Sequence, residues 1–425
     1  MVHNQNCEPQ ARSSPPVAKI EPFHLGGYGP REELAMWYRK SKRSRAARSP
    51  RPSGLEMSTL VRTQKLRHQR ACRSATTESA SGVPNGVNMR LAVASASSTW
   101  EAALANVLSS GDEILVLNSG RFAEAWGKMA DLMDLTVLSL PQDWRHAVDP
   151  EAVEARLRAD TKGRIKAVLV VQVDTASGVV NDIAAIVAAV RAAGHDALVM
   201  VDTIASLATM PVEMDDWGVD IAVSGSQKGL MLPPGLSFVA AGERAWAAHP
   251  AAGLRTRYWD WTARHGELHP EKYCGTPPEH LLYGLRCSLD MLLQEGLENV
   301  IQRHRLLAEA VRLAVATWCE DGALEFNIID PEERANSVTT VLMDEAYDPL
   351  GFRDFCRQCC GVVVGGGIGD LRGKALRIAH MGHINAPHIL GALGVVELGL
   401  IARNVPHGSG GVQKAIEFLG ENLKA

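Results

Sequence analysis

The stretch LVMVDTIASLATMPVEMDDWGVDIAVSGSQKGLMLPPG, residues 198–235, indicates the fold class of this chain. It contains two continuous apolar runs, residues 198–201 and 221–223, which are typical of strands buried on both faces. The first run stops at Asp202, and the second leads through residues 224–227 to Lys228. Ligands of parallel α/β sheets bind at the carboxyl ends of the strands, so we expect Asp202 and Lys228 to face one crevice.

An acid and a lysine in one crevice suit the chemistry of pyridoxal 5′-phosphate. The Asp202 carboxylate would keep the pyridine nitrogen of the cofactor protonated, so that its ring can accept electrons. The Lys228 amine would hold the cofactor covalently. The alternative is that both are ordinary charged residues at a solvent edge, which is the commoner case for any single acid.

Composition sets limits on the class of protein. With 425 residues, 46% hydrophobic and 22% charged, the chain can bury a large core and form two or more domains. A net charge of −4 argues against a general nucleic-acid binder, and no apolar run reaches the roughly 18 residues of a membrane span. The eight cysteines show no disulfide-framework spacing, which favours a reducing compartment and predicts a cytoplasmic protein.

Several segments resemble the class V aminotransferases, specifically their serine–glyoxylate and alanine–glyoxylate branch. They are VDTIAS at residues 201–206, MDDWGVDIAVSGSQKG at 214–229 and LPPGL at 232–236, and the resemblance extends over about residues 89–419. It implies an α/β protein of PLP-dependent transferase fold type I. A large domain with a mostly parallel sheet would span residues 89–285, and a linking helix with a smaller α/β C-terminal domain residues 286–425. It also implies a homodimer with shared active sites.

The segment before the resemblance, residues 1–88, is different in character. Residues 31–73 are crowded with Arg, Lys, Ser and Pro without helical or strand periodicity, a composition typical of disorder. Three interpretations stay open: a basic targeting or nucleic-acid arm, an ordinary disordered extension, or a mis-specified N-terminus that replaces the family's own first segment. We favour the third, because the opening motifs of the family are not visible upstream of Met89.

The cofactor phosphate is expected at the loop SASSTWEAAL, residues 95–104, between a strand at 89–94 and a helix that begins near Trp100. Free amides and the dipole of a helix N-terminus favour an anion there. The family loop is of the type SGTGAWEAAL, so this chain lacks both glycines and their backbone freedom. The hydroxyls of Ser97, Ser98 and Thr99 are therefore predicted to donate hydrogen bonds instead.

The resemblance assigns further residues to the cofactor. Phe122 falls where the family stacks an aromatic ring on the cofactor, and Ile204 and Gln227 lie next to Asp202 and Lys228 in the matched motifs. The segment QVDTASG, residues 172–178, stands where the family has HNETATG. It keeps Thr175, our candidate for a hydrogen bond to the cofactor ring hydroxyl. Taken alone, an aromatic residue such as Phe122 is more often simply core packing.

Two more site features follow from the resemblance. Tyr273 and Thr276 match residues that reach the phosphate of the neighbouring subunit's cofactor, although from sequence alone an ordinary turn is the better interpretation. Arg377 matches the residue that would fork onto the α-carboxylate of the amino or oxo acid, the geometry for which a guanidinium is suited. Cys356 and Cys359 have CxxC spacing, but no second pair completes a zinc set, and no metal is predicted.

The remaining pattern predicts two long helices over residues 281–318 with a break at 295–296, and strands at 337–342, 361–364 and 374–378. The glycines of residues 365–369 hint at a dinucleotide loop, but no crossover helix follows them.

The function predicted is transamination of serine or alanine with glyoxylate or another small 2-oxo acid. The alternatives are a catalytically impaired relative, an aspartate–glyoxylate aminotransferase and, with little support, a dinucleotide-binding protein.

Overall fold

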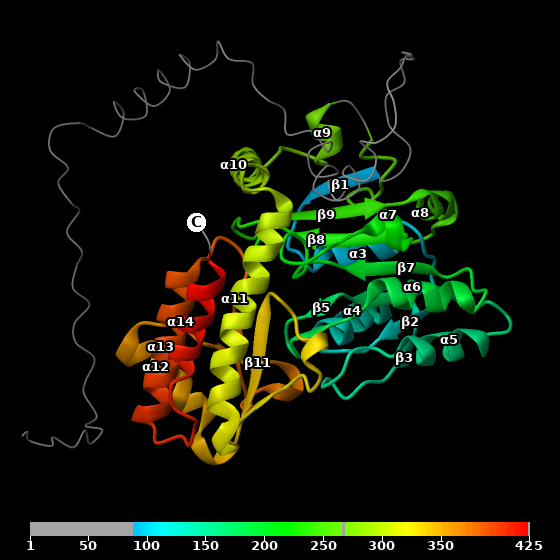
Figure 1. Ribbon diagram of the computed structural model, residues 1–425. Helices are drawn as coiled ribbons and strands as arrows, with labels where there is room; N and C mark the ends of the chain where they lie inside the picture. The colour runs from blue at the N-terminus through cyan, green and yellow to red at the C-terminus, as the bar shows by residue number, and fades with distance from the viewer. Residues whose placement is uncertain (1–87, 266–267, 424–425) are drawn as a thin grey trace, which may run out of the picture. The chain divides into compact units, whose positions relative to one another are not determined.

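The computed structural model describes residues 88–265 and 268–423, so the predictions for residues 1–87 lie outside it. Its main element is a seven-stranded sheet of order β1-β9-β8-β7-β4-β2-β3 (Figure 1). The strands, in chain order, are β1 (Asn88–Val93), β2 (Glu113–Leu117), β3 (Thr136–Leu140), β4 (Ile165–Val171), β7 (Leu198–Asp202), β8 (Ile221–Gly225) and β9 (Leu236–Ala241). The pairs among β3, β2, β4, β7 and β8 are parallel, and β9 runs antiparallel to β8 and β1. The prediction of a mostly parallel sheet is confirmed.

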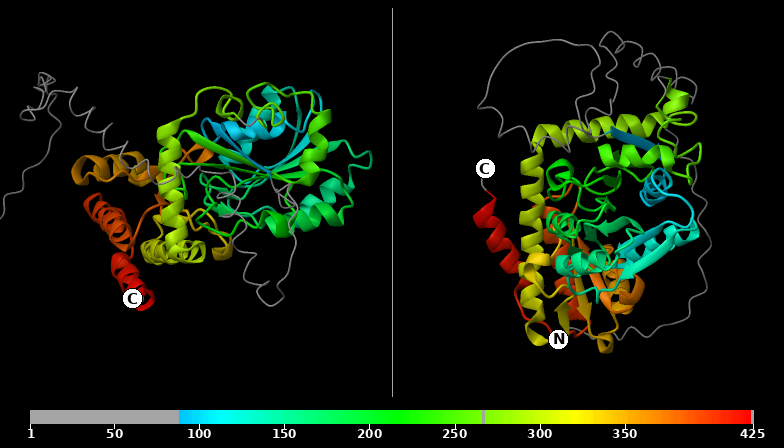
Figure 2. Two further views of the ribbon diagram at one scale, coloured as in Figure 1. Left: turned by 90° about the horizontal axis from the view of Figure 1, so that it is seen from above. Right: turned by 90° about the vertical axis from the view of Figure 1, so that its right-hand side faces the viewer.

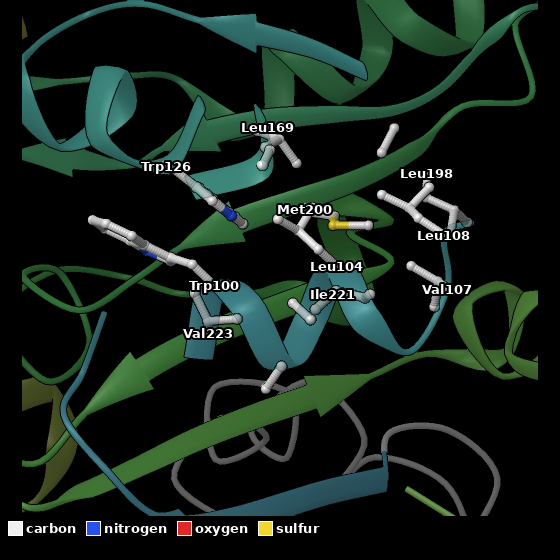
Figure 3. Packing of buried hydrophobic residues seen from close by; sticks show 14 of the residues in the cluster. Trp100, Leu104, Val107, Leu108, Trp126, Leu169, Leu198, Met200, Ile221 and Val223 are labelled. Carbon is white, nitrogen blue, oxygen red and sulfur yellow. The ribbon is translucent and has the colours of Figure 1, made fainter. Parts of the chain in front are cut away.

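Helices cover both faces of this sheet. Successive residues of a strand point to opposite faces, so the central strands contribute apolar side chains to two separate clusters. The cluster drawn in Figure 3 joins α3 (Ser98–Ala105) and α4 (Arg121–Leu132) to alternate residues of the central strands, among them Leu169, Met200 and Val223. The other residues of the same strands pack against α5 (Pro150–Arg158) and α6 (Ile183–Ala192). Strands that are buried on both faces explain the continuous apolar runs in the sequence.

A second, four-stranded sheet follows along the chain, with order β10-β11-β13-β12 and antiparallel pairing throughout. Its strands are β10 (Leu324–Phe326), β11 (Val338–Met343), β12 (Gly365–Gly366) and β13 (Ala375–Ala379). The helices α12 (Pro349–Cys360), α13 (Ala386–Ala402) and α14 (Gly411–Asn422) enclose a separate apolar cluster with it. The two sheets have distinct cores, while the predicted boundary at residues 285 and 286 stays a prediction.

Two long helices connect the sheets: α10 (Glu279–Glu295) and α11 (Leu297–Trp318). They meet at a sharp corner, visible in the right panel of Figure 2. Gly296 lies at this corner with a φ of 85°, a conformation that glycine adopts without steric cost. The predicted break at residues 295–296 is therefore confirmed.

One predicted strand, at residues 361–364, is wrong. Gly361 takes a left-handed conformation as the C-cap of α12, and strand pairing begins only at Gly365. The valines that suggested a strand lead up to that pairing without forming it. A short 3₁₀ helix at Gly369–Leu371 and then β13 follow, so the glycine cluster leads into a strand and not into the α-helix that a dinucleotide loop requires.

The shorter elements complete the described chain. They are β5 (Val173–Asp174), β6 (Val179–Val180), α7 (Met214–Trp217), α8 (Glu243–Ala248), α9 (His269–Lys272) and 3₁₀ turns at His249–Ala251, Cys319–Asp321, Pro331–Glu333 and Glu345–Tyr347. Within the described ranges, none of the helices is long and apolar enough to span a bilayer, and no group of His, Cys, Asp or Glu side chains forms a metal-binding cluster.

Candidate active site

Asp202 and Lys228 lie at the same edge of the large sheet. Asp202 is the last residue of β7, and Lys228 follows three residues after β8, which pairs with β7 in parallel. The electrostatic interaction between the two side chains affects the pKa of each. The two residues thus lie at one sheet edge, while the crevice that they are expected to face stays a prediction.

The Asp202 carboxyl is almost fully buried, with 3% of its surface exposed. Its Oδ1 accepts a hydrogen bond of 2.7 Å from the backbone N–H of Ile204, and its Oδ2 one of 2.7 Å from the indole Nε1 of Trp100. Burial nevertheless raises the pKa of this carboxyl to about 7, with the charge of Asp174 acting in the same direction. A buried acid of this kind is most stable beside a bound cation.

Lys228 is half-buried, and its pKa is lowered by burial first and then by the positive charge of Arg377. A lysine amine with a lowered pKa is more often neutral, which is the state needed for nucleophilic attack. The nearby Asp202 charge opposes this effect without cancelling it.

Arg377 comes from β13 of the small sheet and brings its guanidinium to this site. Its Nε donates to the carbonyl of Gly366 at 2.6 Å, and its Nη1 donates to the carbonyl of Thr175 at 2.9 Å. These two bonds fix the guanidinium plane and leave Nη2 without a hydrogen-bond partner in the part of the chain that the structure describes. A fixed guanidinium with a remaining donor can hold a carboxylate.

The loop at residues 95–99 differs from the expectation. The hydroxyl of Ser98 donates to the carbonyl of Ser95, and the hydroxyl of Thr99 donates to that of Ala96. A hydroxyl has one proton, so neither can donate to a phosphate at the same time. Of the three predicted donors, only the Ser97 hydroxyl is not used in this way, and the prediction for Ser98 and Thr99 needs their hydroxyls to rotate.

The same loop packs closely against the end of β8. A Cβ atom built on Gly225 would lie 2.4 Å from the Cβ of Ala96 and 2.9 Å from Oε1 of Gln227. That Oε1 atom is buried and has no hydrogen-bond partner among the described residues. The Gln227 Oε1 atom therefore needs a hydrogen-bond donor, while its Nε2 is the amide atom that could donate to a phosphate.

The remaining predicted residues divide into two groups. In the first group, Phe122 and Ile204 are half-buried, and their backbone amides donate to the carboxyls of Asp174 and Asp202. Thr175 is buried, and its carbonyl accepts a hydrogen bond from Arg377. Tyr273 and Thr276 belong to the loop after α9. Burial raises the pKa of the Tyr273 hydroxyl, and the positive charge of Arg264 partly offsets that rise. Their predicted role toward a partner's cofactor stays a prediction.

The sequence interpretation missed two residues of this region, Trp100 and Asp174. In the sequence, Trp100 indicates only the start of a helix, and Asp174 is one position of the segment QVDTASG. Their contacts join segments 102 and 52 residues apart, so local spacing carried no signal for them.

Comparison with known proteins decides the family. Residues 92–368 match the Aminotransferase class-V family. The chain belongs to the class V aminotransferases. Serine–glyoxylate aminotransferase of Methylorubrum extorquens is 39% identical over 335 residues, which cover 77% of this chain and 82% of that protein. L-aspartate–glyoxylate aminotransferase of Paracoccus denitrificans is 36% identical, with coverage of 72% and 76%.

Solved structures agree with this assignment. Pyridoxamine–pyruvate aminotransferase from Mesorhizobium loti superposes with a TM-score of 0.71 at 29% identity, over 79% of this chain and 85% of that one. The fold of this class V aminotransferase is therefore fold type I, as predicted.

The side chains present fit the cofactor that this family implies. Asp202 is a buried carboxyl that a protonated pyridine nitrogen would keep ionised, and Lys228 is an amine with a lowered pKa. The unpaired Gln227 amide adds a polar group beside the lysine. A buried acid and a lysine amine of lowered pKa at one sheet edge are the groups that pyridoxal 5′-phosphate needs at its ring nitrogen and at its aldehyde carbon.

Proposed function

We propose that this class V aminotransferase binds pyridoxal 5′-phosphate and moves an amino group from serine or alanine to glyoxylate or another small 2-oxo acid. The observation that supports this proposal most is the pairing of a buried Asp202 carboxyl with the half-buried Lys228 amine at adjacent parallel strand ends. The similarity to serine–glyoxylate aminotransferases supports the choice of substrates.

Each residue then has a defined task. The bound cofactor supplies a ring that accepts the electrons left when the substrate Cα–H bond breaks. Asp202 holds the ring nitrogen in its protonated form. Lys228 Nζ would hold the cofactor and would serve as the base that takes the proton from the substrate Cα. Arg377 holds the α-carboxylate, which orients the Cα–H bond and directs the reaction to proton loss instead of carboxylate loss.

The flanking residues complete the proposed site. Phe122 would cover one face of the ring, while Ile204 and Thr175 would border it. Ser97, Gln227 and, after rotation of their hydroxyls, Ser98 and Thr99 would contact the phosphate. Tyr273 and Thr276 would reach the cofactor of a second subunit, so the working form would be a homodimer. A cytoplasmic location is part of the same proposal.

Two alternatives are tied to particular observations. The hydroxyls of Ser98 and Thr99 are bonded within their own loop, which supports a relative with weakened cofactor binding. The 36% identity to L-aspartate–glyoxylate aminotransferase supports aspartate as the amino donor. A spectrum and a substrate panel separate these alternatives.

The test is the absorbance spectrum of the full-length protein with added pyridoxal 5′-phosphate, before and after serine, alanine or aspartate. We expect an absorbance band of lysine-bound cofactor that shifts when the preferred amino donor is added. This band should be absent in Lys228→Ala. Lys166→Ala, which changes an exposed lysine of β4, is the control and should behave as the wild type. A band without any shift would support the impaired relative, and a band that persists in Lys228→Ala would refute the assignment of the lysine.

A further inference from the structure

Asp174 is a buried carboxyl that accepts hydrogen bonds from backbone amides of two separate segments. It is 0% exposed, at the end of the two-residue strand β5. Its Oδ2 accepts from the backbone N–H of Phe122 at 2.7 Å and of Ala123 at 3.1 Å, and its Oδ1 accepts from Ala176 N–H at 2.9 Å. Burial raises the pKa of this carboxyl, and the three backbone donors that converge on it partly offset that rise by stabilising the charged form.

Two of these donors belong to the first turn of α4. The first amides of a helix have no partner within the helix, and the N-cap residue usually supplies one. In α4 the N-cap is Gly120, which has no side chain, so the carboxylate of Asp174, 52 residues beyond Phe122, takes its place. A negative charge at this end also interacts favourably with the helix dipole.

The approach of the two segments requires a glycine. A Cβ atom built on Gly120 would lie 2.2 Å from Cγ of Asp174, closer than any side chain permits. The backbone of Gly120 is extended, so the requirement comes from packing and not from conformation.

The segment that carries Asp174 also touches the small sheet. Thr175, the next residue, accepts the hydrogen bond from Arg377 Nη1. Thr340 of β11 donates to the carbonyl of Ala176 at 3.3 Å. Residues 174–178 therefore contact α4 of the large domain and both β11 and Arg377 of the small sheet.

We propose that Asp174 is a positioning residue that caps α4 from a distant strand. It holds Phe122 on one flank of the site in fixed relation to Thr175 and Arg377 on the other. Asp174 itself touches neither cofactor nor substrate in this proposal. The consequence for the cofactor rests on the proposed function, whereas the attachment of α4 does not.

The first test measures backbone amide exchange in the protein without cofactor. Asp174→Asn keeps the size of the side chain but leaves one oxygen for two sets of donors. We expect the Phe122 and Ala123 amides to exchange about 10- to 100-fold faster, the loss that accompanies removal of a charged acceptor. Asp182→Asn is the matched control, because Asp182 caps α6 from an exposed position through Ala185 N–H. It should leave the α4 amides unchanged.

A second variant guards against failure of Asp174→Asn to fold. Gly120→Ala keeps the carboxylate but forces it away from the helix, and it should also accelerate exchange of the α4 amides. Unchanged exchange in the folded variants would overturn the proposal.

The second test asks whether Asp174 acts through Phe122. We expect Asp174→Asn to raise the dissociation constant of pyridoxal 5′-phosphate about 10-fold or more in the wild-type background, and much less in a Phe122→Ala background. Equal effects in both backgrounds would mean general destabilisation and would contradict the positioning role. If the wild type binds no cofactor, the proposed function fails, and the exchange measurement alone decides whether Asp174 holds α4.

Discussion

Trp100→Phe is the substitution that tests the electrostatics of the site most directly. The indole Nε1 of Trp100 donates a 2.7 Å hydrogen bond to Oδ2 of Asp202, and both groups are buried. Phenylalanine keeps an aromatic ring and removes only the donor and part of the volume. A hydrogen bond to a charged group contributes about 1.5–3 kcal/mol, which corresponds to roughly one to two pKa units on Asp202.

The expected effect depends on pH. Burial raises the pKa of the folded-state Asp202 carboxyl from 3.8 to about 7, so the folded chain binds a proton that the unfolded chain releases between these values. The unfolding free energy therefore falls as pH rises across that window. Trp100→Phe raises the pKa of Asp202 further, so the fall continues to higher pH. Relative to the wild type, the unfolding free energy of the variant should be lower by about 1–2 kcal/mol more at about pH 9 than at about pH 5.

Urea unfolding of the cofactor-free protein at the two pH values measures this difference. Trp126→Phe is the matched control. Trp126 stacks on Trp100 with ring centroids 5.9 Å apart, and its buried Nε1 has no hydrogen-bond partner among the described residues (Figure 3). The Trp126→Phe variant should therefore lose the same amount of unfolding free energy, from packing alone, at both pH values. A loss in Trp100→Phe that is the same at both, or that Trp126→Phe reproduces, would refute the role of the indole donor.

Three further outcomes are expected. Arg377→Lys keeps the positive charge but loses the two parallel donors of the guanidinium, so KM for the amino acid should rise about 10-fold or more while kcat changes less. Steady-state kinetics in which kcat alone fell would contradict this. Gly225→Ala places a Cβ 2.4 Å from that of Ala96 and should cost about 1–3 kcal/mol of unfolding free energy together with cofactor affinity. Unchanged urea and cofactor titrations would show that the loop at residues 95–99 moves to make room for the added methyl group. Asp202→Asn should reduce the fall in unfolding free energy expected between about pH 4 and about pH 7, leaving the contribution of Asp174, whose pKa burial also raises. An undiminished fall in the variant would assign the whole effect to other groups.

Much of the fold follows from local pattern. Runs apolar at every position, as at residues 198–201, mark strands covered on both faces, and Gly296 marks the corner between two helices whose apolar positions recur at helical spacing. The placement of Asp202 and Lys228 follows from the same rule, since parallel neighbouring strands present their carboxyl ends at one edge. The strand expected at residues 361–364 shows the limit of this approach, because an apolar run of that length does not reveal whether it has a partner to pair with.

The sequence by itself determined where the buried strands lie along the chain, which acid and lysine stand at their ends, and the family of the chain. These depend on residue type and on spacing within single segments. Only the tertiary structure decided that Trp100 donates to Asp202, that Asp174 caps α4 and that the hydroxyls of Ser98 and Thr99 turn to their own loop. The physical reason is that a hydrogen bond requires two atoms to meet within about 3 Å. For segments 52 or 102 residues apart, that meeting depends on the packing of the whole sheet and its helices.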